Sequence, residues 1–198
     1  MLMRAYQRGF TLIELMVGLA IFAFLLAMGA PSFSTWVQNG QIRTATEAVQ
    51  NGLQLARAEA VRRNMPVRFQ LTNTLTSACA LSTSGSNWVV SLDSPVGACD
   101  AAPTADLAAP TAPRIIQVRA SSEGTANAVI ASDVSNVVFN GLGRPSSAMS
   151  INITNPTGGA CAAATGPMRC LRVIVSAGGQ IRLCDPRFAS TDPQGCPA

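Results

Sequence analysis

Residues 9–31 read GFTLIELMVGLAIFAFLLAMGAP, and this apolar stretch decides where the rest of the chain can lie. Among the 21 residues numbered 10 to 30, Glu14 is the one ionisable side chain. A helix of that length spans ~30 Å, the thickness of the hydrocarbon core of a bilayer. The stretch therefore predicts a membrane-inserted helix. An acid near the bilayer centre costs roughly 2.5–3.5 kcal/mol, so Glu14 needs a partner.

The neighbouring residues offer Glu14 no basic partner. Arg43 lies far downstream of the apolar run, and Arg8 lies outside it on the other side of Gly9. Removal of residues 1–9 would give Phe10 a free ammonium. That ammonium can pair with Glu14 of a neighbouring copy or, less well, of its own helix. We therefore expect the partner to arise from processing and assembly.

The segment GFTLIELMV, Gly9 to Val17, resembles the class III signal of type IV pilins and type II secretion pseudopilins. The resemblance implies that a prepilin peptidase cuts after Gly9, that the new terminal Phe10 is N-methylated, and that Glu14 guides subunit docking into a filament. An ordinary secretory signal has a shorter apolar core and a small-residue cut site, and Met28 stands where such a residue is needed. A plain membrane anchor explains neither Glu14 nor the Gly-Phe junction.

The charges predict the orientation of this span. Arg4 and Arg8 precede it, so the positive-inside rule places residues 1–9 in the cytoplasm and the residues after the span in the periplasm, across the inner membrane. The chain carries 14 basic residues, all arginine, against 10 acids, with no His and a net charge of +4. Loss of Arg4 and Arg8 leaves about +2, which is not the strongly basic balance of a nucleic-acid-binding protein.

The chain length predicts one globular domain behind the membrane segment. We divide the 198 residues into a leader (1–9), a transmembrane half-helix (10–30), an amphipathic half-helix (31–65) and a β-rich periplasmic domain (66–198). The last part holds about 130 residues, enough for one core.

Six cysteines all follow the membrane segment, in an oxidising compartment. Sequence alone does not choose among their pairings, but sequence neighbours suggest the loop clips Cys79 with Cys99, Cys161 with Cys170, and Cys184 with Cys196. The chain has no C-x-x-C motif and no His, so we predict no metal site and no cofactor.

The helical pattern continues past the membrane segment. Pro31 can kink the helix there. Beyond it, apolar residues recur at three- and four-residue steps: Ile42, Ala45, Val49, Leu53, Ala56 and Ala60. We therefore expect one long, gently bent helix from Phe10 to about Arg63, ended by Asn64 and Pro66.

From Val67 the apolar period changes to two, which is typical of strands. The candidate strands are Val67–Leu71, Trp88–Leu92, Arg114–Arg119, Ala128–Ala131, Asn136–Phe139, Met149–Ile153, Cys170–Ser176 and Gln180–Cys184. Ala177-Gly178-Gly179 is a hairpin signal between the last two. The loops Pro95–Pro113 and Asn155–Pro167 are interpreted as surface connections.

Three further segments resemble the FimT/FimU and GspH branch of minor pilins and pseudopilins. They are GLQLARAEAVRR (Gly52–Arg63), VFNGLGR (Val138–Arg144) and GQIRLC (Gly179–Cys184). The resemblance implies an α+β fold in which a long N-terminal transmembrane spine helix packs on a globular domain of two antiparallel sheets. This agrees with the strands expected from the sequence.

These features predict a structural subunit of a type IV filament machine rather than an enzyme. With no His and no Lys, the usual Ser-His, Cys-His, Walker and Schiff-base chemistries are missing. The expected function is a minor pilin, in the tip or initiation complex of a type IV pilus, with other pilins, the prepilin peptidase and the inner membrane as partners. A GspH-like pseudopilin of type II secretion is the alternative.

DNA binding is a second alternative, because some FimT-like minor pilins bind DNA through a C-terminal G-R-x-R motif. The matching positions here are Gly179-Gln180-Ile181-Arg182, with Gln in place of the first Arg. A phosphate-binding strip would have to use Arg169, Arg172, Arg182 and Arg187. We favour a structural role for these arginines, and regard Arg182 and Arg187 as the residues with which to test DNA contact.

Overall fold

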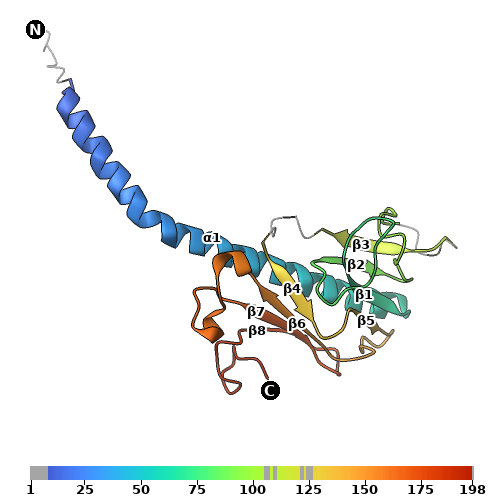
Figure 1. Ribbon diagram of the computed structural model, residues 1–198. Coiled ribbons are helices and arrows are strands. Elements are labelled where there is room, and N and C mark those ends of the chain that lie inside the picture. Colours follow the sequence, from blue (N-terminus) through green and yellow to red (C-terminus); the bar gives the residue numbers. More distant parts are fainter. Residues whose placement is uncertain (1–8, 105–107, 109–110, 121–122, 124–126, 198) are drawn as a thin grey trace, which may run out of the picture.

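The molecule is built along one helix, α1 (Leu12–Arg63), of 52 residues (Figure 1). The computed structural model describes residues 9–104, 108, 111–120, 123 and 127–197, with the backbone alone at 28–31. The predicted leader lies outside the described residues except for Gly9. The predicted long helix is confirmed, and it begins two residues later than expected.

The helix is bent more sharply than the gentle curve expected from the sequence. Its two parts, Leu12–Ala27 and Ser32–Arg63, meet at an angle of 42°. The predicted kink residue, Pro31, belongs to the interval between them, where only the backbone is described. The first part extends away from the rest of the molecule, and the second part lies along the globular domain (Figure 1).

The end of α1 is defined by its C-cap, as predicted. Asn64 takes the left-handed conformation at φ 52°, and its N–H donates to the carbonyls of Ala60 and Val61. Arg62 and Arg63 in the last turn face the negative end of the helix dipole. The cap therefore turns the chain directly into the first strand.

The second part of α1 buries the predicted stripe of small and branched side chains. Its members Ile42, Ala45, Val49, Leu53, Ala56 and Ala60 are all buried. At Gly52 the helix backbone lies very close to the strands. A Cβ atom placed there would lie 2.9 Å from ring atoms of both Phe69 and Trp88. The helix thus packs tightly on the aromatic side chains of the adjoining strands.

Among the described residues, eight strands form two four-stranded antiparallel sheets, and each strand lies within one residue of the predicted bounds. The first sheet has the order β3-β2-β1-β5, with β1 at Val67–Thr72, β2 at Asn87–Ser91, β3 at Ile115–Arg119 and β5 at Asn136–Phe139. The second has the order β4-β6-β7-β8, with β4 at Val129–Ser132, β6 at Met149–Thr154, β7 at Leu171–Val175 and β8 at Ile181–Cys184.

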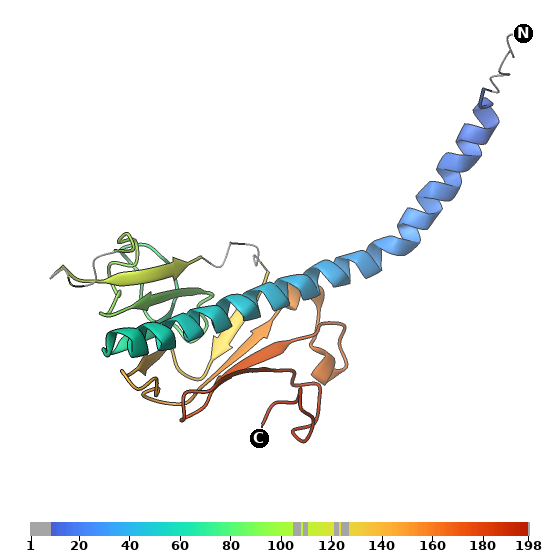
Figure 2. The same ribbon diagram turned by 180° about the vertical axis from the view of Figure 1, so that it is seen from behind.

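The helix contacts both sheets and joins them into one core. It packs against β1, β2 and β5 of the first sheet and against β6, β7 and β8 of the second. Figure 2 shows α1 running across the two sheets. The core between them includes Phe69, Phe139, Ile151, Ile153 and Val173, all fully buried. The α+β class with a two-sheet domain is confirmed.

The chain changes sheets between β4 and β5. β4 pairs with β6, whereas β5, only a few residues later, pairs with β1. The connecting residue Asp133 fixes this crossing, because its Oδ1 accepts from the N–H groups of Val134 and Ser150, each at 2.9 Å. The strands of the two sheets are therefore interleaved along the chain.

Three disulfides restrain the loops outside the sheets. They join Cys79 to Cys99, Cys161 to Cys170 and Cys184 to Cys196, which are the pairs suggested by sequence proximity. The first pair packs with Val89 and Ile115 in a small cluster of its own beside the first sheet. The other two pairs fix the loop before β7 and the C-terminal tail.

Candidate functional site

The amino end of α1 places the carboxylate of Glu14 in a capping box. Thr11 is the N-cap, and Glu14 Oε2 accepts from the Thr11 backbone N–H at 2.9 Å and from the Thr11 hydroxyl at 2.8 Å. The Glu14 N–H donates to Thr11 Oγ1 at 3.3 Å. Such reciprocal bonds satisfy donors that a helix start otherwise leaves free.

This local partner was missed at the sequence level. We expected Glu14 to pair with the Phe10 ammonium created by processing, on a neighbouring copy or, less well, on its own helix, but the structure supplies two donors from Thr11. The signal is present in the sequence as the T-x-x-E spacing of Thr11-Leu12-Ile13-Glu14. The carboxylate is thereby held next to Gly9 and Phe10, which precede the helix, and the Phe10 side chain is 90% exposed.

Within the described part of the chain, nothing covers the apolar side chains of the first part of α1. Every described residue from Gly9 to Ala27 is exposed. The large apolar members of this surface are Phe10, Leu12, Ile13, Leu15, Met16, Val17, Leu19, Ile21, Phe22, Phe24, Leu25 and Leu26. We call residues 10–27 the apolar sleeve. Side chains of this kind need to be covered by lipid or by protein.

Among the described residues, no single straight helix is both long enough and apolar enough to cross a membrane. The bent pair Leu12–Ala27 and Ser32–Arg63 together has the length and composition for it.

The globular domain forms hydrogen bonds to α1 at Gln38 and Asn39. Asn155, fully buried, donates from Nδ2 to the backbone carbonyl of Gln38 at 3.3 Å and to its side-chain Oε1 at 2.6 Å. The backbone N–H of Arg169 donates to Asn39 Oδ1 at 2.7 Å. We call residues 155–170 the clamp loop. The sequence interpretation of Asn155–Pro167 as a surface connection was therefore incomplete, because its first residue is buried against the helix.

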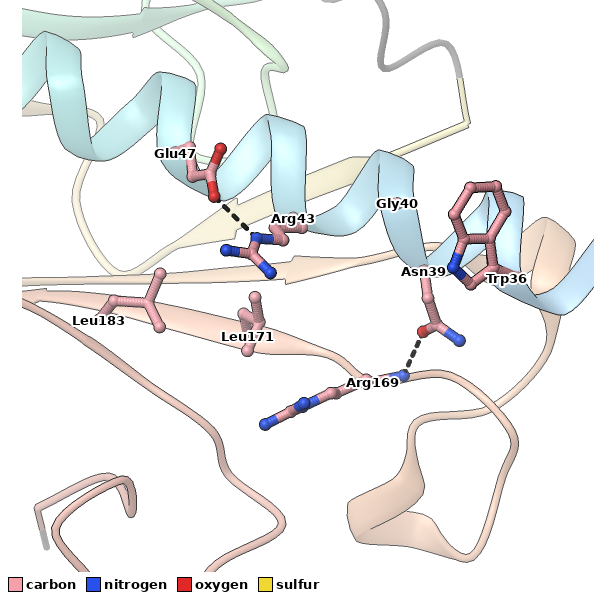
Figure 3. A pocket seen from close by; sticks show the side chains of 8 residues that line it. All are labelled: Trp36, Asn39, Gly40, Arg43, Glu47, Arg169, Leu171 and Leu183. Atoms are coloured by element: carbon pink, nitrogen blue, oxygen red, sulfur yellow. Dashed lines mark hydrogen bonds and ion pairs between the residues drawn. The ribbon is translucent and has the colours of Figure 1, made fainter.

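A groove of about 550 Å³ lies beside the clamp, between α1 and the second sheet (Figure 3). It is lined by Trp36, Asn39, Gly40, Arg43, Glu47, Arg169, Leu171 and Leu183. Arg43 and Glu47 form an ion pair at 2.8 Å across one turn of α1, and this hydrogen bond raises the pKa of Arg43. Leu171 and Leu183 form the apolar part of the lining, and Trp36 stands at one end.

The groove carries no surplus of positive charge, because its two arginines both have acidic partners. Arg43 pairs with Glu47, and Arg169 Nε lies 2.8 Å from Asp185 Oδ2, whose side chain is only 4% exposed. Within the described ranges, no group of three or more His, Cys, Asp or Glu side chains is placed to hold a metal ion. The lining therefore combines an apolar part with two arginines whose charges are balanced by acidic partners.

The four arginines considered for DNA contact lie on or beside the second sheet, and each interacts within the chain. Besides the Arg169 pair, Arg172 Nε donates to Asn152 Oδ1 at 2.6 Å. One terminal nitrogen of Arg182 donates to the carbonyls of Pro193 and Gly195, at 2.8 and 3.0 Å. The guanidinium of Arg187 lies 4.6 Å from the ring centroid of Phe188.

The turn that carries the Gly179-Gln180 sequence forms the β7–β8 hairpin. Gly179 has φ +84° and donates to the Ser176 carbonyl at 2.8 Å. A glycine is needed there for its backbone conformation. The positive φ of Gly179 and the hydrogen bonds of Arg182 therefore give both residues of this segment a structural role.

Comparisons with known proteins agree with these features. The family model described as "Type II transport protein GspH" matches residues 45–179, and the model of the prokaryotic N-terminal methylation motif matches residues 4–30. A comparison with curated proteins gives no match.

Two solved structures are similar, both of the type IV minor pilin FimU of Pseudomonas aeruginosa strain PAO1, in space groups P21 and P65. Each is 16% identical to this chain. The first covers 81% of this chain and 98% of its own at a TM-score of 0.49, and the second covers 78% and 98% at 0.47. Because the GspH model spans more than half of the residues, the chain belongs to the GspH family, the minor pilins and pseudopilins of the type IV pilin-like class.

Proposed function

We propose that this chain is a structural subunit of a type IV filament machine, a minor pilin or pseudopilin with no catalytic chemistry of its own. The observation that carries the proposal is the apolar sleeve, exposed throughout, with the single carboxylate of Glu14 held in its first turn. A surface of this kind is stable in lipid or against other apolar helices. The methylation motif over residues 4–30 supports the same proposal.

The proposed assembly begins with the leader, residues 1–9, in the cytoplasm, the half-helix 10–30 in the inner membrane and the rest of the chain in the periplasm. The prepilin peptidase cuts after Gly9, and Phe10 becomes an N-methylated amino terminus. Residues 31–65 then join the span to the domain of residues 66–198. The sleeve that held the monomer in the membrane becomes the surface that packs against other pilins.

Glu14 has a two-stage role in this proposal. In the isolated subunit, the two Thr11 donors lower the cost of keeping the carboxylate in an apolar environment. On assembly, the terminal ammonium of a neighbouring subunit adds an opposite charge at the same end of the helix. The pairing favours one axial register between subunits, because only that register brings ammonium and carboxylate together.

The processing step is tested by the intact mass of the native protein and by its amino-terminal sequence. We expect a chain that starts at Phe10 and carries one added methyl group. A chain that starts at Met1, or beyond Ala30, would contradict the proposal. Gly9→Val should accumulate the unprocessed precursor. Gly18→Val is the matched control in the sleeve, because neither glycine has a neighbour within 4 Å of an added Cβ.

The docking step is tested with Glu14→Val. This variant should be processed normally but should enter filaments far less than the wild type does, because the charge pairing is lost. Filament levels equal to the wild type would remove Glu14 from the proposed mechanism.

Two machines use subunits of this class, and we place the chain first in the tip or initiation complex of a type IV pilus. The family description, which names type II transport, favours the GspH-like pseudopilin of a type II secretion system as the second candidate. Deletion of the gene in its native host separates them. Loss of surface pili with normal secretion supports the pilus, and loss of secreted proteins with normal pili supports the secretion system.

A further inference from the structure

Two exposed aromatic side chains lie on α1 just before Gln38, where the hydrogen bonds from the globular domain begin. Phe33 is 66% exposed and Trp36 is 72% exposed. They are three residues apart, so they share a face of the helix, and their ring centroids lie 6.0 Å apart. Large exposed aromatic side chains at the base of a folded domain need a specific environment.

Their position along the helix coincides with the change from apolar to polar surface. Exposed large apolar side chains occur on this part of α1 at Phe33, Trp36 and Val37, and the polar residues Gln38, Asn39 and Arg43 follow them. The clamp begins at Gln38, two residues beyond Trp36. The aromatic pair therefore lies directly between the lipid-compatible part of the chain and the water-compatible part.

We propose that Phe33 and Trp36 form an interfacial anchor that lies among the lipid headgroups and holds the clamp loop against the membrane surface. This inference rests on the proposed function, because it requires the sleeve to be inserted in a bilayer. Tryptophan is enriched at membrane interfaces, where its apolar ring and its N–H group both find suitable surroundings.

The length of the helix supports this depth. A span over residues 10–30 measures ~30 Å at 1.5 Å per residue, which fills the hydrocarbon core. Trp36 lies six residues further, ~9 Å along the axis. Because the second part of α1 is inclined by 42° to the first, the height gained along the first part's axis is smaller, ~7 Å. The headgroup layer on each side of the core is about that thick.

The clamp loop has the composition that such a location requires. Residues 155–168 of the loop read NPTGGACAAATGPM and contain no charged side chain, and Arg169, the one charged residue of the loop, forms an ion pair with Asp185. Ala163 and Ala164 in this loop are exposed, and the disulfide from Cys161 to Cys170 fixes its shape. Both ribbon views show the loop on the side of the domain that faces the free part of α1 (Figures 1 and 2). An uncharged, small-residue surface can approach headgroups with little desolvation cost.

The depth of Trp36 can be measured in the full chain, because the protein has only two tryptophans and Trp88 is buried in the core. The full chain is reconstituted in phosphatidylcholine and phosphatidylglycerol vesicles that contain lipids brominated either near the headgroup or near the end of the acyl chain. The emission of Trp36 is the wild-type spectrum minus the spectrum of Trp36→Phe. This subtraction leaves Trp88 unchanged in both samples.

We expect the Trp36 emission to be blue-shifted from its value in water, and mostly lost with the headgroup-proximal bromines but little affected by the deep bromines. Emission as in water without quenching by either lipid would overturn the anchor, and so would stronger quenching by the deep bromines. The first of these results would leave the aromatic pair free for another subunit.

A second reporter separates failure of this inference from failure of the proposed function. Phe22→Trp is made in the Trp36→Phe background, and its emission is obtained by the same subtraction. Phe22 lies in the middle of the sleeve, so the deep bromines should quench the new tryptophan. If they do so while Trp36 is unquenched, the membrane span stands and the anchor is wrong. If neither position is quenched, the membrane insertion itself is wrong.

Discussion

Asn155 donates hydrogen bonds from one side-chain nitrogen to both the backbone carbonyl and the side-chain oxygen of Gln38, at 3.3 and 2.6 Å. Its own side-chain oxygen accepts from the Gly158 N–H at 3.4 Å. A single buried amide thus ties the clamp loop to the helix and also shapes the loop. These side-chain hydrogen bonds fix α1 to the domain at Gln38.

The first prediction concerns this amide. Asn155→Ala should lower the free energy of unfolding by about 1–3 kcal/mol, because the Gln38 groups lose their buried donor. Urea unfolding of the full chain in detergent, followed by Trp88 fluorescence in the Trp36→Phe background, measures the loss. Asn51→Ala, on the exposed face of α1, is the control and should be close to neutral. Equal stability of the two variants would mean that the clamp contributes little.

The second prediction uses two glycines of the same helix. Gly52→Ala should destabilise the domain by about 1–3 kcal/mol, because the added methyl group would lie 2.9 Å from the Phe69 and Trp88 rings. Gly40→Ala has no atom within 4 Å of the added carbon and should stabilise the helix by about 0.5–1 kcal/mol. The same unfolding experiment reports both. A stabilising effect at both positions would disprove tight packing at Gly52.

The third prediction is a pH dependence from the ion pair between Asp93 and Arg114, whose closest atoms are 2.7 Å apart. The hydrogen bonds from Arg114 lower the pKa of Asp93 from 3.8 to about 2. A carboxyl group with a lowered folded-state pKa stabilises the protein above its unfolded-state pKa, and this contribution disappears as the pH falls through the folded-state value.

Asp93→Asn should therefore cost about 2 kcal/mol near neutral pH, and the difference from wild type should disappear between about pH 4 and pH 2. Unfolding curves across that range test this. Asp100→Asn, at an exposed position, makes the same change of side chain and serves as the control. If the wild type is still more stable than Asp93→Asn by the same free energy of unfolding at pH 2, ionisation of Asp93 is not the source of the difference.

The fourth prediction concerns Arg182 and the DNA-binding alternative. Because Arg182 donates to the carbonyls of Pro193 and Gly195, Arg182→Gln should loosen the tail and increase its cleavage in limited proteolysis. We expect no micromolar DNA binding by the full chain in a gel-shift assay at moderate salt. Arg57→Gln, an exposed residue of α1, matches the change in charge. DNA binding that is lost with Arg182→Gln and Arg187→Gln but kept with Arg57→Gln would establish the alternative.

The elements of this fold could be predicted closely from the sequence because their signals are local. The period-two pattern of Val67–Leu71 and the Ala177-Gly178-Gly179 turn each lie within one element or one connection. The stripe from Ile42 to Ala60 needs only the helical repeat. Pairing of cysteines that are near neighbours also follows from short loops, as for Cys161 and Cys170.

The parts that were missed depend on contacts between distant residues or on a spacing that was not used. The hydrogen bonds from Asn155 to Gln38 join positions 117 residues apart. No feature of the sequence NPTGG predicts that its first residue is a buried amide. The groove exists only because β7 and β8 pack beside α1. The capping box of Thr11 and Glu14, by contrast, has a local signal in the T-x-x-E spacing and needs no charged partner.

The exchange of the chain between sheets has a consequence for how the domain forms. Ribosomes release a chain from its amino terminus, so β1 appears long before β5, its neighbour in the sheet. When Phe139 has been synthesised and can pair with Val67, β4 has also been synthesised, but its pairing partner β6 has not. Each half of the domain thus stays unfinished until the other has begun. Folding of the domain should therefore be a single late event, in which both sheets are completed while they pack against α1.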